Sequence, residues 1–93
     1  MNPSGGAATQ IASPQFDQRF FALPAGTQQQ IQSKIDELGR NLRGHSHFRM
    51  QGVDAFRLRV GDFRVVYQFH VEKNELYLAA VGNRRDVDKK LSN

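Results

Sequence analysis

The stretch that most constrains the fold is residues 56–67, which read FRLRVGDFRVVY. Apolar residues alternate with two arginines before a central Gly-Asp pair, and the pattern restarts after it with Phe63 and Arg64. A period of two places the two kinds of side chain on opposite faces of a strand. A glycine followed by aspartate suits a type II′ turn between two antiparallel strands. The turn pairs Val60 with Phe63. One step further from the turn, Arg59 faces Arg64.

Three arginines on one face of this hairpin indicate an anionic ligand. Arg57 lies diagonal to Arg64 and on the same side as Arg59, and all three are expected to face outward. Like charges directly across an antiparallel pair destabilise it by a few tenths of a kcal/mol up to about 1 kcal/mol. The planar guanidinium group matches phosphate well, so we interpret this face as a phosphate-binding surface. The alternative is a solvated strand face whose arginine stems cover apolar surface.

Length and composition favour one small domain. The 93 residues allow a modest core, with 1–8 as a flexible N-terminus and 9–93 as the folded domain. The chain contains no cysteine, which excludes disulfides and thiolate sites. No apolar run approaches the ~18 residues of a membrane span and no signal peptide is evident, so we expect a cytoplasmic protein that does not bind a membrane.

Positive charge is concentrated toward the C-terminus. The formal net charge is +4, and eight of the thirteen lysines and arginines lie from Arg57 onward. Such an asymmetry favours a polyanion or an acidic protein as the partner. The charge by itself does not distinguish between these two.

Two helices, packed as a hairpin, are expected before the arginine-rich strands. Ser13 is a typical N-cap and Pro14 a typical first residue for a short helix. A second helix begins at Pro24 or Thr27 and repeats its apolar residues at spacings of four, three and four, as a core-facing stripe does. The stripe is Ile31, Ile35, Leu38 and Leu42. A short edge strand at 9–12 precedes both helices.

The segment 43–52 is expected to be a loop that leads into the hairpin. His45 and His47 form a His-x-His pair, but no third ligand stands nearby, so we do not expect a metal site. His47 is a candidate for proton transfer near the arginines, because the unperturbed pKa of histidine is near 6.5. Phe48 is either a base-stacking surface or a residue that packs in the core or anchors the loop.

The rest of the chain is expected to complete an antiparallel meander. The second strand of the hairpin continues to Val71, and 76–81 forms an apolar strand that is expected to be covered on both faces and central in the sheet. Residues 84–91 then form a short amphipathic helix. Arg84 and Arg85 follow the end of the third strand, which is expected to bring them to the rim of the arginine-bearing face.

The order of these elements and two motifs resemble the RelE/ParE superfamily of bacterial toxins. The motifs are RLRVGDFRVVY in the hairpin and VGNRRDV before the tail helix, and the resemblance covers roughly residues 9–91. It implies an α+β fold with an N-terminal strand, a two-helix hairpin packed on an antiparallel sheet, and a short C-terminal helix. It also implies a toxin of a type II toxin–antitoxin system, with the RelE branch favoured.

The RelE branch implies a ribosome-dependent mRNA endoribonuclease, or mRNA interferase, that inhibits translation. Such enzymes direct the 2′-hydroxyl of the message onto the adjacent phosphate, which implies no metal and no cofactor. The candidate catalytic residues by this match are Arg57, Arg59, Arg64 and Arg85. The candidate substrate-binding residues are Arg84, Phe48 and Lys89. The implied partners are a cognate antitoxin, the ribosome and mRNA, with operator DNA bound only by the toxin–antitoxin complex.

Two departures from the RelE pattern leave other functions open. The positions on the first hairpin strand are often lysine in that branch, and an arginine clamps phosphate well but shuttles protons poorly. The tail-helix tyrosine that stacks on the substrate in several members falls at Asp88. The alternatives are a ParE-like inhibitor of DNA gyrase and a catalytically weak homologue that acts through protein binding.

Overall fold

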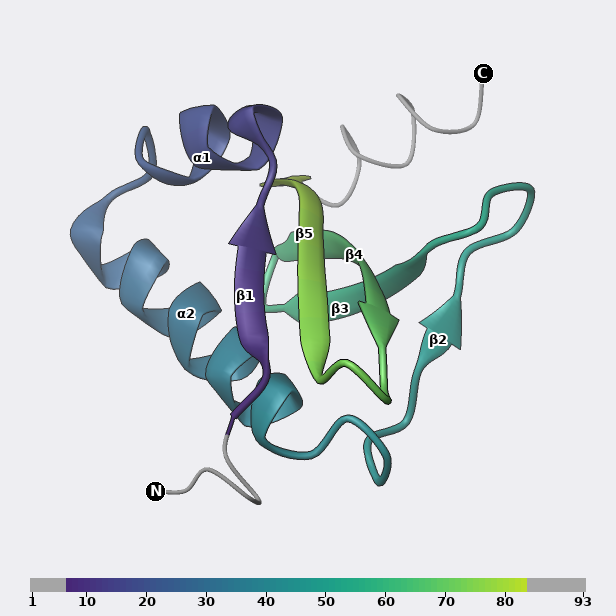
Figure 1. Cartoon of the computed structure of the whole chain (residues 1–93). Coiled ribbons are helices and arrows are strands. Elements are labelled where there is room, and N and C mark those ends of the chain that lie inside the picture. Colours follow the sequence, from purple (N-terminus) through teal and green to yellow (C-terminus); the bar gives the residue numbers. More distant parts are fainter. Residues whose placement is uncertain (1–6, 84–93) are drawn as a thin grey trace.

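Two helices and one five-stranded sheet make up residues 7–83, the part of the chain that the computed structural model describes (Figure 1). The elements are β1 (Thr9–Ala12), α1 (Pro14–Phe20), α2 (Ala25–Arg40), β2 (Phe48–Arg49), β3 (Phe56–Val60), β4 (Phe63–His70) and β5 (Glu75–Asn83). The strand order is β1-β5-β4-β3-β2, with β1 parallel to β5 and the other pairs antiparallel. The predicted α+β fold is confirmed, whereas the predicted helix at 84–91 lies outside the described residues.

The β3–β4 hairpin has the register predicted from its sequence. Val60 pairs with Phe63 next to the turn, and each further pair steps back by one residue. Gly61 has a positive φ of +57°, whereas the φ of Asp62 is not positive. A positive φ followed by a negative φ is the pattern of a type II′ turn, which matches the twist of the two strands.

Local signals set where the helices begin. The Ser13 hydroxyl caps α1 by accepting from the Phe16 N–H at 3.0 Å, and it donates to the carbonyl of Ala79 in β5 at 2.7 Å. α2 begins directly after Pro24, as expected, and ends at Arg40. Both helices pack on the same face of the sheet, and each contacts the sheet more extensively than it contacts the other helix. No helix within residues 7–83 is long and apolar enough to cross a membrane.

The main core fills the space between the helices and the sheet. It includes all four members of the predicted stripe, although α2 ends at Arg40 and Leu42 therefore lies in the turn after the helix. The largest fully buried side chains of this core are Tyr67, Ile31, Ile35, Leu38, Leu76 and Val65. Ala8, assigned from the sequence to a flexible terminus, is instead buried beside this core, and its N–H donates to the Gly39 carbonyl at 2.9 Å. The ordered domain therefore begins earlier than residue 9.

A polar link joins β1 to α2. The Asp36 carboxylate accepts from the side-chain amides of Gln10 at 2.7 Å and Gln32 at 2.9 Å. The Gln32 amide also donates to the side-chain oxygen of Gln10 at 2.9 Å. These hydrogen bonds, from Gln10 first and Gln32 second, lower the pKa of Asp36, because they favour its charged form.

A second, smaller apolar cluster covers part of the opposite face of the sheet. Met50 and Val66 are buried in it, and Val53, Ala55 and Ala80 pack against them. The segment that contributes Met50 was predicted to be a loop, and that prediction is partly wrong because β2 forms within it. Two residues are too few to show a strand periodicity, so only the pairing with β3 reveals this strand.

Candidate nucleic-acid interface

Arg57, Arg59 and Arg64 lie on the face of the sheet that points away from α1 and α2, and we call this the arginine face. Arg59 pairs directly with Arg64, and Arg57 pairs with Val66 of the second apolar cluster. Leu58, between the two β3 arginines, is buried in the main core on the other side. The prediction that three cations share one face is therefore confirmed by the register.

Exposure differs among the three arginines. The prediction that Arg64 faces freely outward is wrong, because only 6% of it is exposed. It lies on β4, which has neighbours on both sides, so adjacent strands flank its side chain. Arg57 is half-buried and Arg59 is exposed, since β2 pairs with only two residues of β3 and leaves the end of that strand open.

The two β3 arginines have no acidic partner within residues 7–83. The ion pairs in this part of the chain join Lys34 to Glu37 and Arg49 to Asp54. The positive charge of Arg57 and Arg59 is thus not neutralised by a described carboxylate. Two neighbouring guanidinium groups, one half-buried and one exposed, are suited to bind a phosphate when no carboxylate neutralises them.

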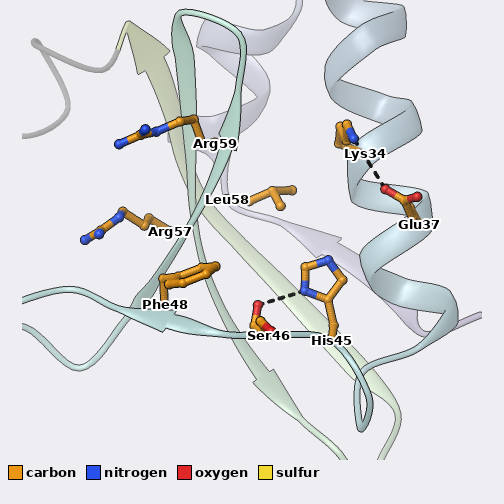
Figure 2. A pocket seen from close by; sticks show the side chains of 8 residues that line it. All are labelled: Lys34, Glu37, His45, Ser46, Phe48, Arg57, Leu58 and Arg59. Carbon is orange, nitrogen blue, oxygen red and sulfur yellow. Dashed lines mark hydrogen bonds and ion pairs between the residues drawn. The ribbon is translucent and has the colours of Figure 1, made fainter.

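A cavity of about 400 Å³ adjoins β3 on its open side (Figure 2). Its lining comes from α2, the loop before β2, β2 itself and β3: Lys34, Glu37, His45, Ser46, Phe48, Arg57, Leu58 and Arg59. Figure 2 shows Arg57 and Arg59 extending to one side of β3, whereas Leu58 points toward α2. The volume lies within the range of about 300–1,000 Å³ that is common for ligand sites.

Phe48 borders both this cavity and the arginine face. It pairs with Arg57 across the β2–β3 ladder, so the two side chains lie on the same side of the sheet. Figure 2 shows the phenyl ring next to Arg57. Because 58% of Phe48 is exposed, the structure does not support the alternative of an anchor buried in the core.

His47 does not lie on the arginine face. Its Nε2 atom is 2.7 Å from the Leu42 carbonyl, which only accepts, so Nε2 carries a proton and donates. In the neutral ring Nδ1 then accepts a hydrogen bond from the Tyr67 hydroxyl at 2.7 Å. Burial raises the pKa of Tyr67 to about 12, so this hydroxyl keeps its proton and can donate. The ring also stacks on Phe69 at 4.0 Å. These contacts hold His47 on the core side of the sheet, so the structure does not bring it together with the arginines, as the predicted proton transfer requires.

Other cavity residues were not chosen as site residues from the sequence. Lys34 and Glu37 lie on the exposed face of α2, where charged residues are ordinary. His45 was considered only as half of a metal pair, and its Nδ1 donates to the Ser46 carbonyl at 2.8 Å. No local pattern marks these residues, because the cavity brings them together from separate elements. Arg84, Arg85, Asp88 and Lys89 lie outside the described residues.

Fold and site together define a small α+β domain with a basic sheet face. A family model described as ParE toxin of type II toxin–antitoxin systems, parDE, matches residues 11–87. The chain belongs to this family, and it is a RelE/ParE superfamily toxin of a type II toxin–antitoxin system. The resemblance seen in the sequence is confirmed.

Solved structures of RelE toxins have the same fold. The E. coli RelBE toxin–antitoxin complex matches with a TM-score of 0.71 and 20% identity, covering 83% of this chain and 96% of that one. A mutant of E. coli RelE in the free state matches with a TM-score of 0.73 and 19% identity, covering 94% of this chain and 93% of that one. The RelE–RelB complex of Pyrococcus horikoshii matches with a TM-score of 0.68 and 18% identity, covering 85% of this chain and 97% of that one. A search of curated proteins found no significant match.

Proposed function

We propose that this toxin is an mRNA interferase, a metal-independent endoribonuclease that cuts messages on the ribosome and so inhibits translation. The observation that carries the proposal is the pair Arg57 and Arg59, which project from one sheet face without an acidic partner in residues 7–83. A stable sheet has no need for this arrangement, since Arg59 faces the like charge of Arg64. An RNA phosphate supplies the missing negative charge.

The proposed reaction is a transfer of the phosphodiester to the neighbouring 2′-hydroxyl. The 2′-oxygen forms a bond to phosphorus, the bond from phosphorus to the 5′-oxygen of the next nucleotide breaks, the attacking hydroxyl loses a proton and the leaving oxygen gains one. Arg57 and Arg59 hold the phosphate in line and stabilise the charge that develops on it. Arg64 supports them from beneath, and Arg85 is proposed as the fourth cation.

Proton transfer is assigned to groups of the ribosome in this proposal. Arginine is effectively always protonated, so the three sheet arginines do not accept the 2′-hydroxyl proton. His47 is directed to Leu42 and Tyr67 on the other side of the sheet. This division of roles explains how a site rich in arginine can promote the reaction through position and charge.

A cognate antitoxin is the proposed protein partner. The RelE chains of E. coli and Pyrococcus horikoshii were each solved together with RelB, and both share the fold of this chain. An acidic antitoxin segment would compete with RNA for the arginine face by the same charge complementarity. Operator DNA is expected to bind only the toxin–antitoxin complex.

A second candidate function is inhibition of DNA gyrase. The family match to ParE toxins favours it, as does Asp88 in place of a tyrosine that stacks on the substrate. The cationic face is also compatible with an acidic protein surface. The two candidates differ in the molecule that is damaged when the toxin acts.

The test uses the purified toxin with ribosomes programmed by a defined mRNA, and primer extension detects the cuts. We expect cleavage only in the presence of ribosomes, and Arg59→Ala should slow it by about 100-fold because one charge-stabilising donor is lost. Arg19→Ala, on the exposed side of α1, is the matched control and should cut normally. Intact message together with DNA breaks in toxin-expressing cells would contradict the interferase proposal and favour gyrase.

A further inference from the structure

We propose that Phe48 is a base-stacking platform on which a nucleobase of single-stranded RNA lies while Arg57 and Arg59 hold the adjoining phosphates. This inference rests on the proposed function for its choice of RNA. It adds a residue that determines how the message is positioned, and it assigns a ligand to the cavity beside β3.

The exposure of Phe48 is the first observation. Three large apolar side chains are markedly exposed within residues 7–83, namely Ile11 at 41%, Phe21 at 67% and Phe48 at 58%. Single exposed apolar residues are common on protein surfaces. Phe48 differs from the other two because it lines the cavity and adjoins two arginines that have no acidic partner within residues 7–83.

The placement of the ring is the second observation. Phe48 and Arg57 are direct partners on neighbouring antiparallel strands, and such partners have Cβ atoms about 4.5–5.5 Å apart on the same side. Arg59 follows on that side, two residues further along β3. A flat aromatic face beside cations is the arrangement that binds single-stranded nucleic acid, because bases stack on the ring and phosphates meet the charges.

The two residues that follow Phe48 fix the position of its backbone. Arg49 donates to the Asp54 carboxylate at 2.7 Å, and its guanidinium carbon lies 5.7 Å from the centre of the Phe56 ring. The N–H of Met50 donates to the Ala55 carbonyl at 2.9 Å. Phe48 is thus presented by a strand whose position does not depend on burying the phenyl ring, as a preorganised binding residue requires.

A single tryptophan can report directly on stacking, because the chain has no natural tryptophan. Phe48→Trp is titrated with a short single-stranded oligoribonucleotide, and we expect its fluorescence to be quenched as a base stacks on the indole. An oligonucleotide of equal phosphate number but without bases should bind without this quenching. Phe21→Trp, at a similarly exposed position directly after α1, is the matched control and should not respond.

Cleavage by ribosome-bound toxin gives an independent measurement. Phe48→Ala should lower kcat/KM for mRNA by about 10- to 100-fold, whereas Phe48→Tyr should stay within about 3-fold because the aromatic face is kept. Phe21→Ala should retain the rate of the natural chain. A circular-dichroism melt of each variant establishes that the fold is intact.

The outcomes separate the platform from the proposed function. Quenching at Phe48→Trp without any mRNA cleavage by the natural chain would support the platform and reject the interferase. Normal cleavage by Phe48→Ala, or quenching by the base-free oligonucleotide, would reject the platform. A fluorescence change with an antitoxin peptide and none with RNA would also overturn it, because the exposed ring would then be a protein-binding anchor.

Discussion

At the residue scale, Asp36 is the carboxylate whose chemistry is most clearly altered by the fold. Two glutamine amides, one from β1 and one from α2, donate to it and lower its pKa below the ordinary value of 3.8. A group with a lowered pKa in the folded state stabilises the protein above its unfolded pKa. That contribution is lost as the pH falls through the pKa of the folded state.

We therefore predict that Asp36→Asn flattens the dependence of stability on pH. The free energy of unfolding of the natural chain should fall as the pH is lowered below about 4, and the variant should show less of this decline. Urea unfolding at a series of acidic pH values measures the difference. Asp17→Asn, at an exposed position of α1, serves as the control. Identical acid profiles for the Asp36 variant and the natural chain would contradict the prediction.

A second residue-scale prediction concerns the hydrogen bond between Tyr67 and His47. Tyr67→Phe removes the hydroxyl and leaves Nδ1 of His47 without its partner inside the protein, which should cost about 1–3 kcal/mol of unfolding free energy. Tyr77→Phe is the matched control, because its hydroxyl donates to Glu75 at a more exposed site. Equal losses for the two variants in urea unfolding would show that burial of the Tyr67 bond adds nothing.

At the element scale, the β3–β4 hairpin depends on its turn. Gly61 adopts a φ of +57°, a conformation that costs an L-residue about 1–2 kcal/mol. The turn sets which residues of the two strands meet, and so it places Arg59 opposite Arg64. The site is therefore coupled to the backbone geometry of a single glycine.

We predict that Gly61→Ala lowers the unfolding free energy by about 1–2 kcal/mol. Gly26→Ala, in the first turn of α2, has the opposite expected sign, with a gain of up to about 1 kcal/mol. A Cβ atom would meet nothing within 4 Å at either position, so backbone conformation alone separates the two. Chemical denaturation of both variants is the measurement, and a shared sign would contradict the argument.

At the scale of the whole molecule, the two faces of the sheet have different roles. One face joins the helices in the main core, and the other combines a small apolar cluster with arginines. Under the proposed function this second face binds an anion, and the like charges of Arg59 and Arg64 that face each other there oppose the stability of the free protein. This difference can be measured because stability and activity should change in opposite directions.

Arg59→Glu should raise the unfolding free energy by up to about 1 kcal/mol at low salt, since it replaces a like-charge pair with an attractive one. The same variant should lose mRNA cleavage. Arg57→Glu is the control, because its direct partner on β4 is Val66, and it should gain less stability. Added salt should reduce the difference between them. A stability loss in Arg59→Glu at low salt would argue against selection for anion binding.

Much of the fold was predictable because its signals are local. The alternation around Gly61 predicted the hairpin register, and Ser13 with Pro14 predicted the start of α1. The apolar spacing of α2 predicted which of its side chains enter the core. Each of these patterns acts within a few residues of the chain, where backbone geometry and periodicity are decisive.

The sequence by itself determined that three arginines share one side of the sheet, because strand parity and turn geometry suffice for that. Only the tertiary structure decided that Arg64 is buried between neighbouring strands and that His47 is bound to Tyr67 and Leu42. It also decided that Phe48 is exposed next to Arg57. Burial and side-chain partners depend on segments that are distant in the chain, and no local pattern encodes where those segments meet.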